Sequence, residues 1–327
     1  CVLELCYYCS NDLKKNRLKE KMSRKGNKQT EAVELRVGSE LVGSKGVYIV
    51  KEFLGEGGFG KVAKCSKLWR GFGKVARCTK LGSPEIYAIK IITNVQEGKE
   101  EFESMKLIQV LDPDENHLMK MYECFSFQNV ICLVYEILEE SLEDFLIKNE
   151  CKATPLTYVR ALAQQMFQAL KALKSIGVVH CDIKLDNIMF ADKNSLKFKL
   201  IDFGLAVESK ELPIGTEIQV TRFRAPEVIL GLPLDESVDM WALGMVLACV
   251  YFGNYPFPSR TEYETIRAMV QIFGLPEADV LNRAKNKDTF FTRDNGYDDI
   301  ISAPNSSCCW RCLSPLSSDV PNFGRAV

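Results

Sequence analysis

The chain has 327 residues, of which 46% are hydrophobic and 26% are charged, so it can bury one large core or two moderate ones. This composition excludes a chain that is disordered over most of its length. Lys and Arg total 42 against 43 Asp and Glu, which excludes a protein whose main role is to coat nucleic acid or an anionic membrane. No direct nucleic-acid binding is expected.

The 13 cysteines are too sparse to indicate a disulfide scaffold, and they favour a reducing, intracellular location in the nucleus or the cytoplasm. Two pairs have C-x-x-C spacing, Cys6 with Cys9 and Cys309 with Cys312, but no histidine lies near either pair. We interpret them as unpaired thiols rather than zinc ligands. The longest apolar stretch, from Met240 to Phe252, is shorter than the ~20 residues of a membrane span and predicts a buried core helix.

The first part of the chain is a basic, irregular tail, which we assign to residues 1–42. Short runs rich in β-forming residues come next. These runs span residues 47–54, 62–68, 75–81, 86–93 and 130–138. A helix is predicted between them over residues 96–111, with its apolar stripe formed by Phe102, Met105, Ile108 and Leu111.

Helical periodicity begins at residue 157, where the predicted apolar face consists of Leu162, Phe167, Leu170 and Leu173. A sheet followed by helices predicts an α+β protein with two lobes of different composition. We place the small β lobe at residues 43–139 and the larger, mainly helical lobe at 140–295. Residues 296–327 are rich in Ser, Pro and Cys, and we predict an irregular tail there.

A local duplication interrupts the first lobe. Residues 58–68 recur 13 positions later as residues 71–81, with conservative changes. Two copies of this length do not make a solenoid, which needs about three or more longer repeats. Either copy can supply the second strand of the sheet.

A glycine-rich loop begins at the first copy. Residues 55–62 fit the pattern G-x-G-x-x-G-x-V through Gly55, Gly57, Gly60 and Val62. Glycines at this spacing let backbone N–H groups approach a triphosphate closely. The dinucleotide-binding version of the pattern is followed by a helix, whereas β-forming residues follow this one.

A lysine closes the strand over residues 86–93. Lys90 can hold the α- and β-phosphates of a nucleotide if a carboxylate on the following helix orients it. We assign Glu103 to that role, with Glu100 and Glu101 as neighbouring alternatives.

The strongest chemical signal is the loop over residues 180–187. Asp182 can accept the proton of a substrate hydroxyl, Lys184 can neutralise a transferring phosphoryl group, and Asn187 can bind a metal ion. Asp202 follows an apolar strand and begins the sequence Asp-Phe-Gly. Its hard carboxylate oxygens suit Mg²⁺ bridged to phosphates.

Two further strings follow in order, Ala-Pro-Glu at residues 225–227 and Asp-Met-Trp-Ala-Leu-Gly at 239–244. Each of these six strings alone is compatible with an ordinary loop or helix cap. In this order they resemble the eukaryotic protein kinase family, from about Val47 to Asn295. Further similarity to the homeodomain-interacting protein kinases lies at residues 124–125, 132–136, 224–233 and 274–276.

The resemblance implies a bilobal α+β fold with an antiparallel small lobe and with ATP and Mg²⁺ between the lobes. It implies that Tyr135 lies behind the adenine and that the backbone of Glu136 and Leu138 forms hydrogen bonds with the adenine. Ala88 and Met189 would lie on the two faces of the base. Four side chains would form an apolar stack between the lobes, namely Leu107, Met121, His180 and Phe203.

The chain departs from the family pattern at the duplication. In the family, the valine of the glycine loop lies about 15 residues before the strand lysine, as Val75 does here, whereas Val62 lies 28 residues before Lys90. The second copy lacks the first two glycines, because Leu68 and Arg70 stand in their places. We therefore favour Gly55, Gly57 and Gly60 as the phosphate loop.

The activation segment also departs from the pattern. Cys181 stands where many kinases have an arginine that grips a phosphorylated residue, and Glu217 stands where related kinases have an activating tyrosine. We expect activity without phosphorylation of this segment, although Thr216 and Thr221 are available hydroxyls. Arg224 and its neighbours suggest, by the resemblance, a preference for proline after the phosphoacceptor.

The end of the chain lacks the pattern of the remaining helices of the large lobe, which is therefore expected to be incomplete. The arginine that pairs with Glu227 in the family would come from that region, so we expect Glu227 to be buried without a partner. Apolar side chains facing the same region should be exposed.

The predicted function is transfer of the γ-phosphoryl group of Mg-ATP to hydroxyl groups of proteins. The acceptors are serine and threonine, or, in a kinase of dual specificity, tyrosine as well. The alternatives are an inactive, kinase-like interaction module and a truncated gene product. Partners would be protein substrates, with transcriptional regulators suggested by the resemblance, and no membrane is involved.

Overall fold

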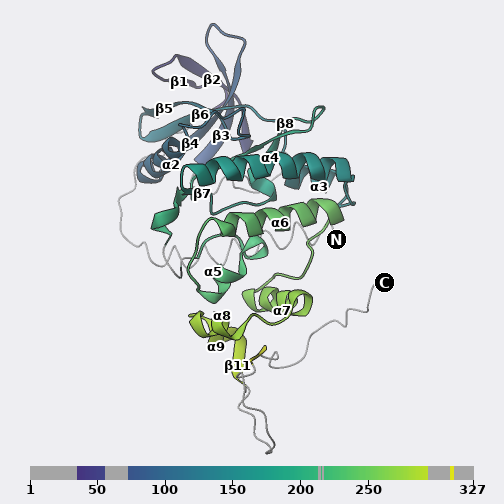
Figure 1. The fold of residues 1–327 in the computed structure, drawn as a ribbon. Coiled ribbons are helices and arrows are strands. Elements are labelled where there is room, and N and C mark those ends of the chain that lie inside the picture. Colours follow the sequence, from purple (N-terminus) through teal and green to yellow (C-terminus); the bar gives the residue numbers. More distant parts are fainter. Residues whose placement is uncertain (1–34, 56–72, 213–214, 216, 294–309, 313–327) are drawn as a thin grey trace, which may run out of the picture.

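The structure, a computed structural model, describes residues 35–55, 73–212, 215, 217–293 and 310–312. A six-stranded sheet and helix α2 form a small lobe, and a larger lobe built mainly of helices follows it (Figure 1). The fold is therefore the two-lobed α+β architecture that the sequence predicts. Among the described helices, none combines the length and the apolar character needed to cross a membrane.

The strands of the small lobe lie in the order β1-β2-β3-β4-β6-β5, and neighbouring strands are antiparallel. Their bounds are Glu40–Val42 (β1), Val47–Gly55 (β2), Gly73–Lys80 (β3), Ile86–Ile92 (β4), Met121–Phe127 (β5) and Val130–Glu136 (β6). Helix α2, Val95–Leu107, packs against β4 and β6.

Strand β3 is formed by the second copy of the repeat. Val75 lies opposite Lys90 of β4 on one side and opposite Gly55, the last residue of β2, on the other. The 15-residue spacing between valine and lysine thus identifies the strand. The first copy, with the strand predicted over 62–68 and with Gly57, Gly60 and Val62, lies outside the described residues.

Strand β6 contributes to two cores because its side chains alternate between the faces of the sheet. Ile131, Leu133 and Tyr135 belong to the large core that continues into the helical lobe. Val130, Cys132 and Val134 belong to a smaller core on the outer face. This burial on both faces explains why six consecutive residues of β6 are apolar or aromatic.

Helix α2 begins at an asparagine cap and approaches the sheet closely. The side chain of Asn94 accepts hydrogen bonds from the N–H groups of Gln96 and Glu97. Gly98 faces β6 so closely that a Cβ atom there would lie 2.6 Å from Cβ of Ile131. The glycine therefore sets the distance between α2 and the sheet, and with it the reach of the helix side chains toward β4.

The large lobe contains seven described α-helices. They span Leu142–Lys148 (α3), Leu156–Ser175 (α4), Pro226–Leu230 (α5), Ser237–Phe252 (α6), Glu262–Phe273 (α7), Ala278–Arg283 (α8) and Lys287–Phe290 (α9). Short antiparallel pairs join Val178–Val179 (β7) to Val207–Glu208 (β10), Ile188–Asp192 (β8) to Lys197–Leu200 (β9), and Phe291–Arg293 (β11) to Trp310–Cys312 (β12). The last strand lies within the segment predicted to be irregular.

The prediction for the buried face of α4 is wrong at one residue. The buried face contains Leu162, Leu170 and Leu173 as predicted, but Met166 takes the place assigned to Phe167, which is 46% exposed. A helical turn of 3.6 residues brings position 166 into line with 162 and 170, and it rotates position 167 outward.

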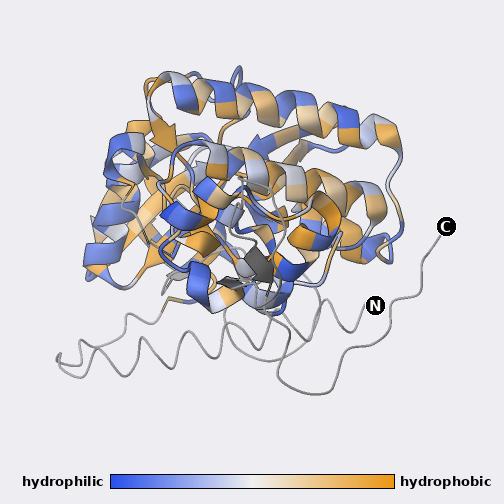
Figure 2. Ribbon diagram, turned by 60° about the horizontal axis from the view of Figure 1, so that its bottom comes forward, coloured by the Kyte–Doolittle hydropathy of each residue, from blue (hydrophilic) through white to orange (hydrophobic). Residues whose placement is uncertain are grey.

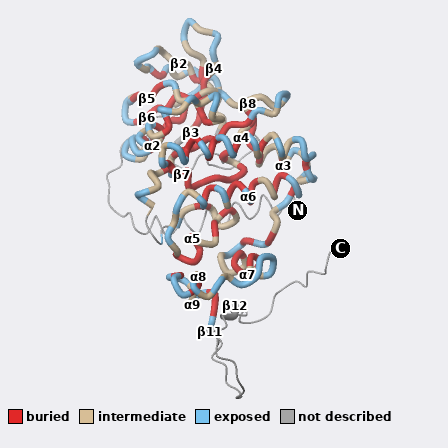
Figure 3. Tube along the Cα trace, viewed as in Figure 1, coloured by how far each residue is buried: buried red, intermediate tan, exposed pale blue. Residues whose placement is uncertain are grey.

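Helix α6 is apolar around its whole circumference, whereas the helices in Figure 2 commonly combine hydrophobic and hydrophilic residues. Figure 3 shows which parts of α6 are buried. Its inner face is buried as predicted, through Val238, Val246 and other residues. Met240 and Phe252 are nevertheless 47% and 58% exposed.

Gly253, which ends α6, should be essential for stability. Its φ of +72° is left-handed, and a Cβ atom would lie 2.3 Å from the carbonyl oxygen of Cys151. We expect Gly253→Ala to lower the free energy of unfolding by about 3 kcal/mol or more, since both strain and a backbone clash arise. Chemical denaturation would measure the loss.

Gly177 supplies the matched control. Its φ is +69°, but a Cβ atom there would meet nothing within 4 Å. Gly177→Ala should therefore cost only the conformational strain, about 1 kcal/mol. Equal losses in the two variants would show that close packing at Gly253 has no energetic importance.

Candidate active site

Lys90 joins the sheet to α2 at the centre of the site. Its ammonium lies 2.6 Å from Oε2 of Glu101 and donates a hydrogen bond of 2.7 Å to Oε1. Both side chains are almost completely buried. Burial raises the pKa of Glu101, and the Lys90 charge opposes that rise.

The prediction that Glu103 orients Lys90 is wrong. Glu103 pairs instead with Lys106 at 2.6 Å, and its side chain is 66% exposed. The physical reason is helical periodicity, since Glu101 shares the inner face of α2 with Gly98 and Met105. The predicted stripe already contained Met105, and position 101 lies one turn before it, so the correct glutamate could have been found from the sequence.

The loop over residues 180–187 brings its three polar side chains together. Lys184 Nζ and Asn187 Nδ2 both donate to Oδ2 of Asp182, the latter at 3.1 Å. Asn187 Nδ2 also donates to the Asp182 carbonyl oxygen at 2.8 Å. These contacts fix the orientation of the Asp182 carboxylate relative to the other two groups.

Two oxygens of this loop are left available. In the described part of the chain, Oδ1 of Asp182 and Oδ1 of Asn187 are buried and have no hydrogen-bond partner. Buried polar atoms are normally paired, so these exceptions indicate positions where a ligand binds. A carboxylate oxygen can accept a proton from a hydroxyl, and an amide oxygen suits a hard cation such as Mg²⁺.

Asp202 approaches the same region from the loop after β9. Its Oδ1 lies 3.6 Å from Nζ of Lys90, and its backbone is left-handed with φ +60°. The N–H of Ile201 donates to the carbonyl oxygen of Asn187 at 2.9 Å, which ties the Asp202 loop to the 180–187 loop. Asn187 and Asp202 are thereby held in one region of the site.

Two described side chains of the site offer oxygen atoms to a cation, the amide of Asn187 and the carboxylate of Asp202. The described residues contain no group of three or more His, Cys, Asp or Glu side chains suited to a metal ion. A cation such as Mg²⁺ usually keeps several waters and binds through one or two protein ligands and substrate phosphates. One amide oxygen and one carboxylate fit that mode.

The 180–187 loop is anchored to α6. The carboxylate of Asp239 accepts the N–H of His180 at 2.7 Å and the N–H of Cys181 at 3.0 Å. Burial raises the pKa of Asp239, and these two hydrogen bonds oppose the rise. His180 also contacts the ring of Phe203, with centroids 4.8 Å apart, so two members of the predicted stack meet.

The Cys181 side chain cannot bind a phosphate group. Its thiol is completely buried, and burial raises its pKa, so it carries no charge that could bind an anion. Its backbone is left-handed, with φ +65°. Glu217 is exposed, and Thr221 begins a short 3₁₀ turn.

The residues expected around adenine come from β4, β6 and β8 and from the segment that follows β6. Ala88 is opposite Tyr135 in these strands, and Met189 lies on β8. The N–H of Glu136 donates to Lys120 at 3.1 Å, and Leu138 is partly buried against the large core. The carbonyl oxygen of Glu136 is thus the group of that peptide suited to an adenine contact.

The segment before α5 is fixed by Arg224. Its guanidinium donates to the carbonyl oxygens of Ile218 and Gln219 at 3.0 and 2.8 Å, and it pairs with Glu262 at 2.5 Å. The expectation for Glu227 is wrong, because this side chain is only partly buried and accepts a hydrogen bond of 3.3 Å from Ser237. Partial exposure removes most of the cost of leaving a charge without an arginine partner.

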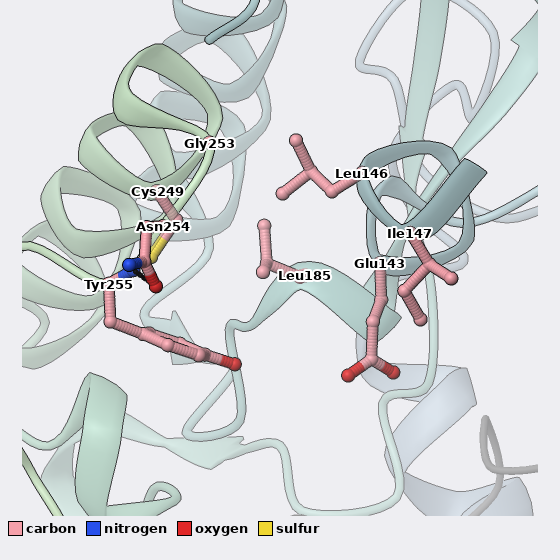
Figure 4. Close-up of a pocket in the computed structure, with 8 residues that line it drawn as sticks. All are labelled: Glu143, Leu146, Ile147, Leu185, Cys249, Gly253, Asn254 and Tyr255. Carbon is pink, nitrogen blue, oxygen red and sulfur yellow. Dashed lines mark hydrogen bonds between the residues drawn. The ribbon is translucent and has the colours of Figure 1, made fainter. Parts of the chain in front are cut away.

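A small cavity lies next to the 180–187 loop, between α3 and the end of α6 (Figure 4). It is lined mainly by apolar groups, and none of Lys90, Asp182 or Asp202 reaches it. Its lining residues are Glu143, Leu146, Ile147, Leu185, Cys249, Gly253, Asn254 and Tyr255. We interpret it as a packing gap rather than as part of the site.

Comparison with known proteins identifies the family. The protein kinase domain matches residues 67–303 of the chain. Homeodomain-interacting protein kinase 1 of Mus musculus is 41% identical over 253 residues, which cover 76% of this chain and 20% of that protein. The protein of the same name from Caenorhabditis elegans is 38% identical over 250 residues, covering 75% and 28%.

A more distant relative is dual specificity protein kinase YAK1 of Saccharomyces cerevisiae, which is 32% identical over 252 residues. The match covers 75% of this chain and 30% of that protein. The chain thus spans less than a third of the length of these three relatives. With its two lobes and the arrangement of Lys90, Asp182 and Asp202, the matched domain shows that the chain belongs to the protein kinase family.

Proposed function

We propose that the chain transfers the γ-phosphoryl group of Mg-ATP to serine or threonine hydroxyls of protein substrates, with tyrosine as an additional acceptor. The observation that supports this most directly is the Asp182 carboxylate, which Lys184 and Asn187 hold by one oxygen while the other has no partner in the described chain. That free oxygen is where a substrate hydroxyl would be bound and activated.

In this proposal, Asp182 Oδ1 accepts the proton as the substrate oxygen forms its bond to the γ-phosphorus. The bond to the bridging oxygen of ADP breaks, and ADP leaves. Lys184 offsets charge on the transferring group, and Lys90 holds the α- and β-phosphates. Asn187 and Asp202 would hold Mg²⁺, which neutralises phosphate charge when it is bound.

The nucleotide base would lie between Ala88 and Met189 and bind the backbone of Glu136 and Leu138, in front of Tyr135. Gly55, Gly57, Gly60 and Val62, with Val75 of β3, would cover the phosphates. We assign Glu217, Thr221, Arg224 and Glu227 to the activation segment, and we expect activity without its phosphorylation. The test is transfer of labelled phosphoryl from Mg-ATP to a generic protein substrate, which Asp182→Asn should abolish.

The proposed substrates have proline after the phosphoacceptor. Gln219 has a left-handed backbone with φ +66°, and its carbonyl oxygen accepts a hydrogen bond from Arg224 Nη2. This acceptor is therefore engaged and cannot serve the N–H of a substrate residue. Proline has no N–H, so it loses nothing in such a site.

We expect kcat/KM to be about tenfold higher for a Ser-Pro peptide than for its Ser-Ala counterpart, the difference that one unpaired N–H group produces. Arg224→Ala, which releases the Gln219 carbonyl, should reduce the preference to about twofold. Arg222→Ala is the control, since that guanidinium stacks on Tyr255 at 4.3 Å instead. Equal rates for both peptides would contradict this assignment.

Transcriptional regulators are the first class of substrates to test, because two of the similar proteins are named as kinases that interact with homeodomain proteins. Such substrates would place the activity in the nucleus, with the cytoplasm as the other proposed compartment. Nucleotide binding without any transfer would instead support an inactive, kinase-like interaction module.

A further inference from the structure

The hydroxyl of Tyr135 lies behind the ion pair of the site. Tyr135 is 1% exposed on strand β6, which lies between β4 and β5, and its hydroxyl donates to Oε1 of Glu101 at 3.4 Å. The same carboxylate binds Lys90 through both of its oxygens. Glu101 is therefore held from two sides, by a cation and by a neutral donor.

Lys90 faces a second carboxylate. Its Nζ lies 2.6 Å from Glu101 and 3.6 Å from Oδ1 of Asp202. All three side chains are at least nine-tenths buried, so the attraction between these charges is only weakly screened by solvent. A Glu101 side chain that turned away from Lys90 would leave the ammonium to pair with Asp202.

We propose that Tyr135 is a positioning residue whose hydroxyl holds Glu101 on Lys90 and so keeps the carboxylate of Asp202 available for the metal ion. This inference rests on the proposed function, because it assumes that Asp202 binds Mg²⁺ with the nucleotide. The hydrogen bond of Tyr135 thus affects metal binding at Asp202 through the charged side chains of Glu101 and Lys90.

The same lobe contains a matched control. The hydroxyl of Tyr48 is buried and donates to Oε2 of Glu123 at 2.8 Å. Tyr48 belongs to the outer core of the sheet, whereas Tyr135 belongs to the core that continues into the helical lobe. Removing either hydroxyl breaks a buried tyrosine–glutamate hydrogen bond. Of these two tyrosines, Tyr135 is the one whose glutamate, Glu101, pairs with Lys90.

The experiment compares Tyr135→Phe with Tyr48→Phe in the full chain. Calorimetry would measure the Mg²⁺ concentration that gives half-maximal binding of ADP, which requires no turnover. We expect Tyr135→Phe to raise this concentration about three- to tenfold, as for the loss of one long hydrogen bond to a charged group. The KM for Mg-ATP should rise by a similar factor, and kcat should change by less than about twofold.

Tyr48→Phe should lose thermal stability but keep the wild-type Mg²⁺ requirement. Tyr135→Leu, which also lacks the hydroxyl, should shift the requirement in the same direction as Tyr135→Phe, so the test does not depend on a single variant. Equal Mg²⁺ requirements in wild type and both Tyr135 variants would overturn the inference and leave the proposed function intact. Failure of wild type to bind ADP with Mg²⁺ would contradict both.

Discussion

Asp182→Asn is expected to lower kcat for phosphoryl transfer about a thousandfold, within the range that a general base contributes. Asparagine keeps the shape of aspartate and can still accept a hydrogen bond from Lys184 or Asn187. It cannot take the substrate proton at a rate comparable to a carboxylate. Because the two residues are so similar in volume, the thermal midpoint should change little and nucleotide binding should persist.

The control for this variant is Asp192→Asn at the end of β8, before the turn to β9. That carboxylate caps its turn through Ser195 and Asn194 and lies at the surface. Transfer rates within about twofold of wild type are expected, because Asp192 lies outside the active site and asparagine can still cap the turn. An Asp182→Asn protein that retained full activity would exclude the proposed role, and loss of nucleotide binding in that variant would point to a folding defect instead.

Glu101→Gln should lower kcat/KM about a hundredfold, whereas Glu103→Gln should leave it within about twofold of wild type. Glu101 is the buried carboxylate that orients Lys90, and a neutral amide cannot hold the ammonium against the attraction of Asp202. Glu103 is mostly exposed, and its partner Lys106 is also a surface residue. Steady-state rates with Mg-ATP would measure both effects.

The two glutamates lie on one helix and differ by two positions, so the pair isolates the effect of orientation toward the sheet. Circular dichroism should show the same helical content in both variants. A larger loss in Glu103→Gln than in Glu101→Gln would mean that α2 is rotated about its axis in the active protein. Equal, small losses would mean that Lys90 does not depend on a helix carboxylate.

Much of the site could be predicted because it is encoded by residues close together in the chain. Asp182, Lys184 and Asn187 lie within one short loop, so their spacing alone brings them together. Asp202 follows a recognisable apolar strand, and Lys90 lies near the end of another. For such local patterns, the sequence and the structure carry nearly the same information.

The carboxylate that pairs with Lys90 could not be predicted from proximity in the sequence alone. Three glutamates stand within four positions on α2, and the choice depends on which face of the helix packs on the sheet. Gly98 indicates that face, because only a residue without a side chain fits against Ile131. The error at Phe167 has the same cause, since a shift of one position rotates a helical side chain by about 100°.

Contacts between residues far apart in the chain could not be predicted from the sequence. The hydrogen bond between Tyr135 and Glu101 joins residues 34 positions apart, and those from His180 and Cys181 to Asp239 join residues more than 50 positions apart. Such pairs depend on how helices and strands pack, which no local pattern specifies.

The place of the duplication within the sheet has a thermodynamic consequence. Both ends of the β2 to β3 connection are fixed by strand pairing, at Gly55 and Gly73, so the 13 additional residues change its length without altering any pair of the described sheet. By chain entropy alone, lengthening a closed loop from four residues to 17 costs only about 1 kcal/mol, since the cost grows with the logarithm of length. A single extra residue inside β6 would instead exchange its two buried faces and disrupt both cores. A large change in length between β2 and β3 should therefore cost the fold less free energy than a change of one residue within β6.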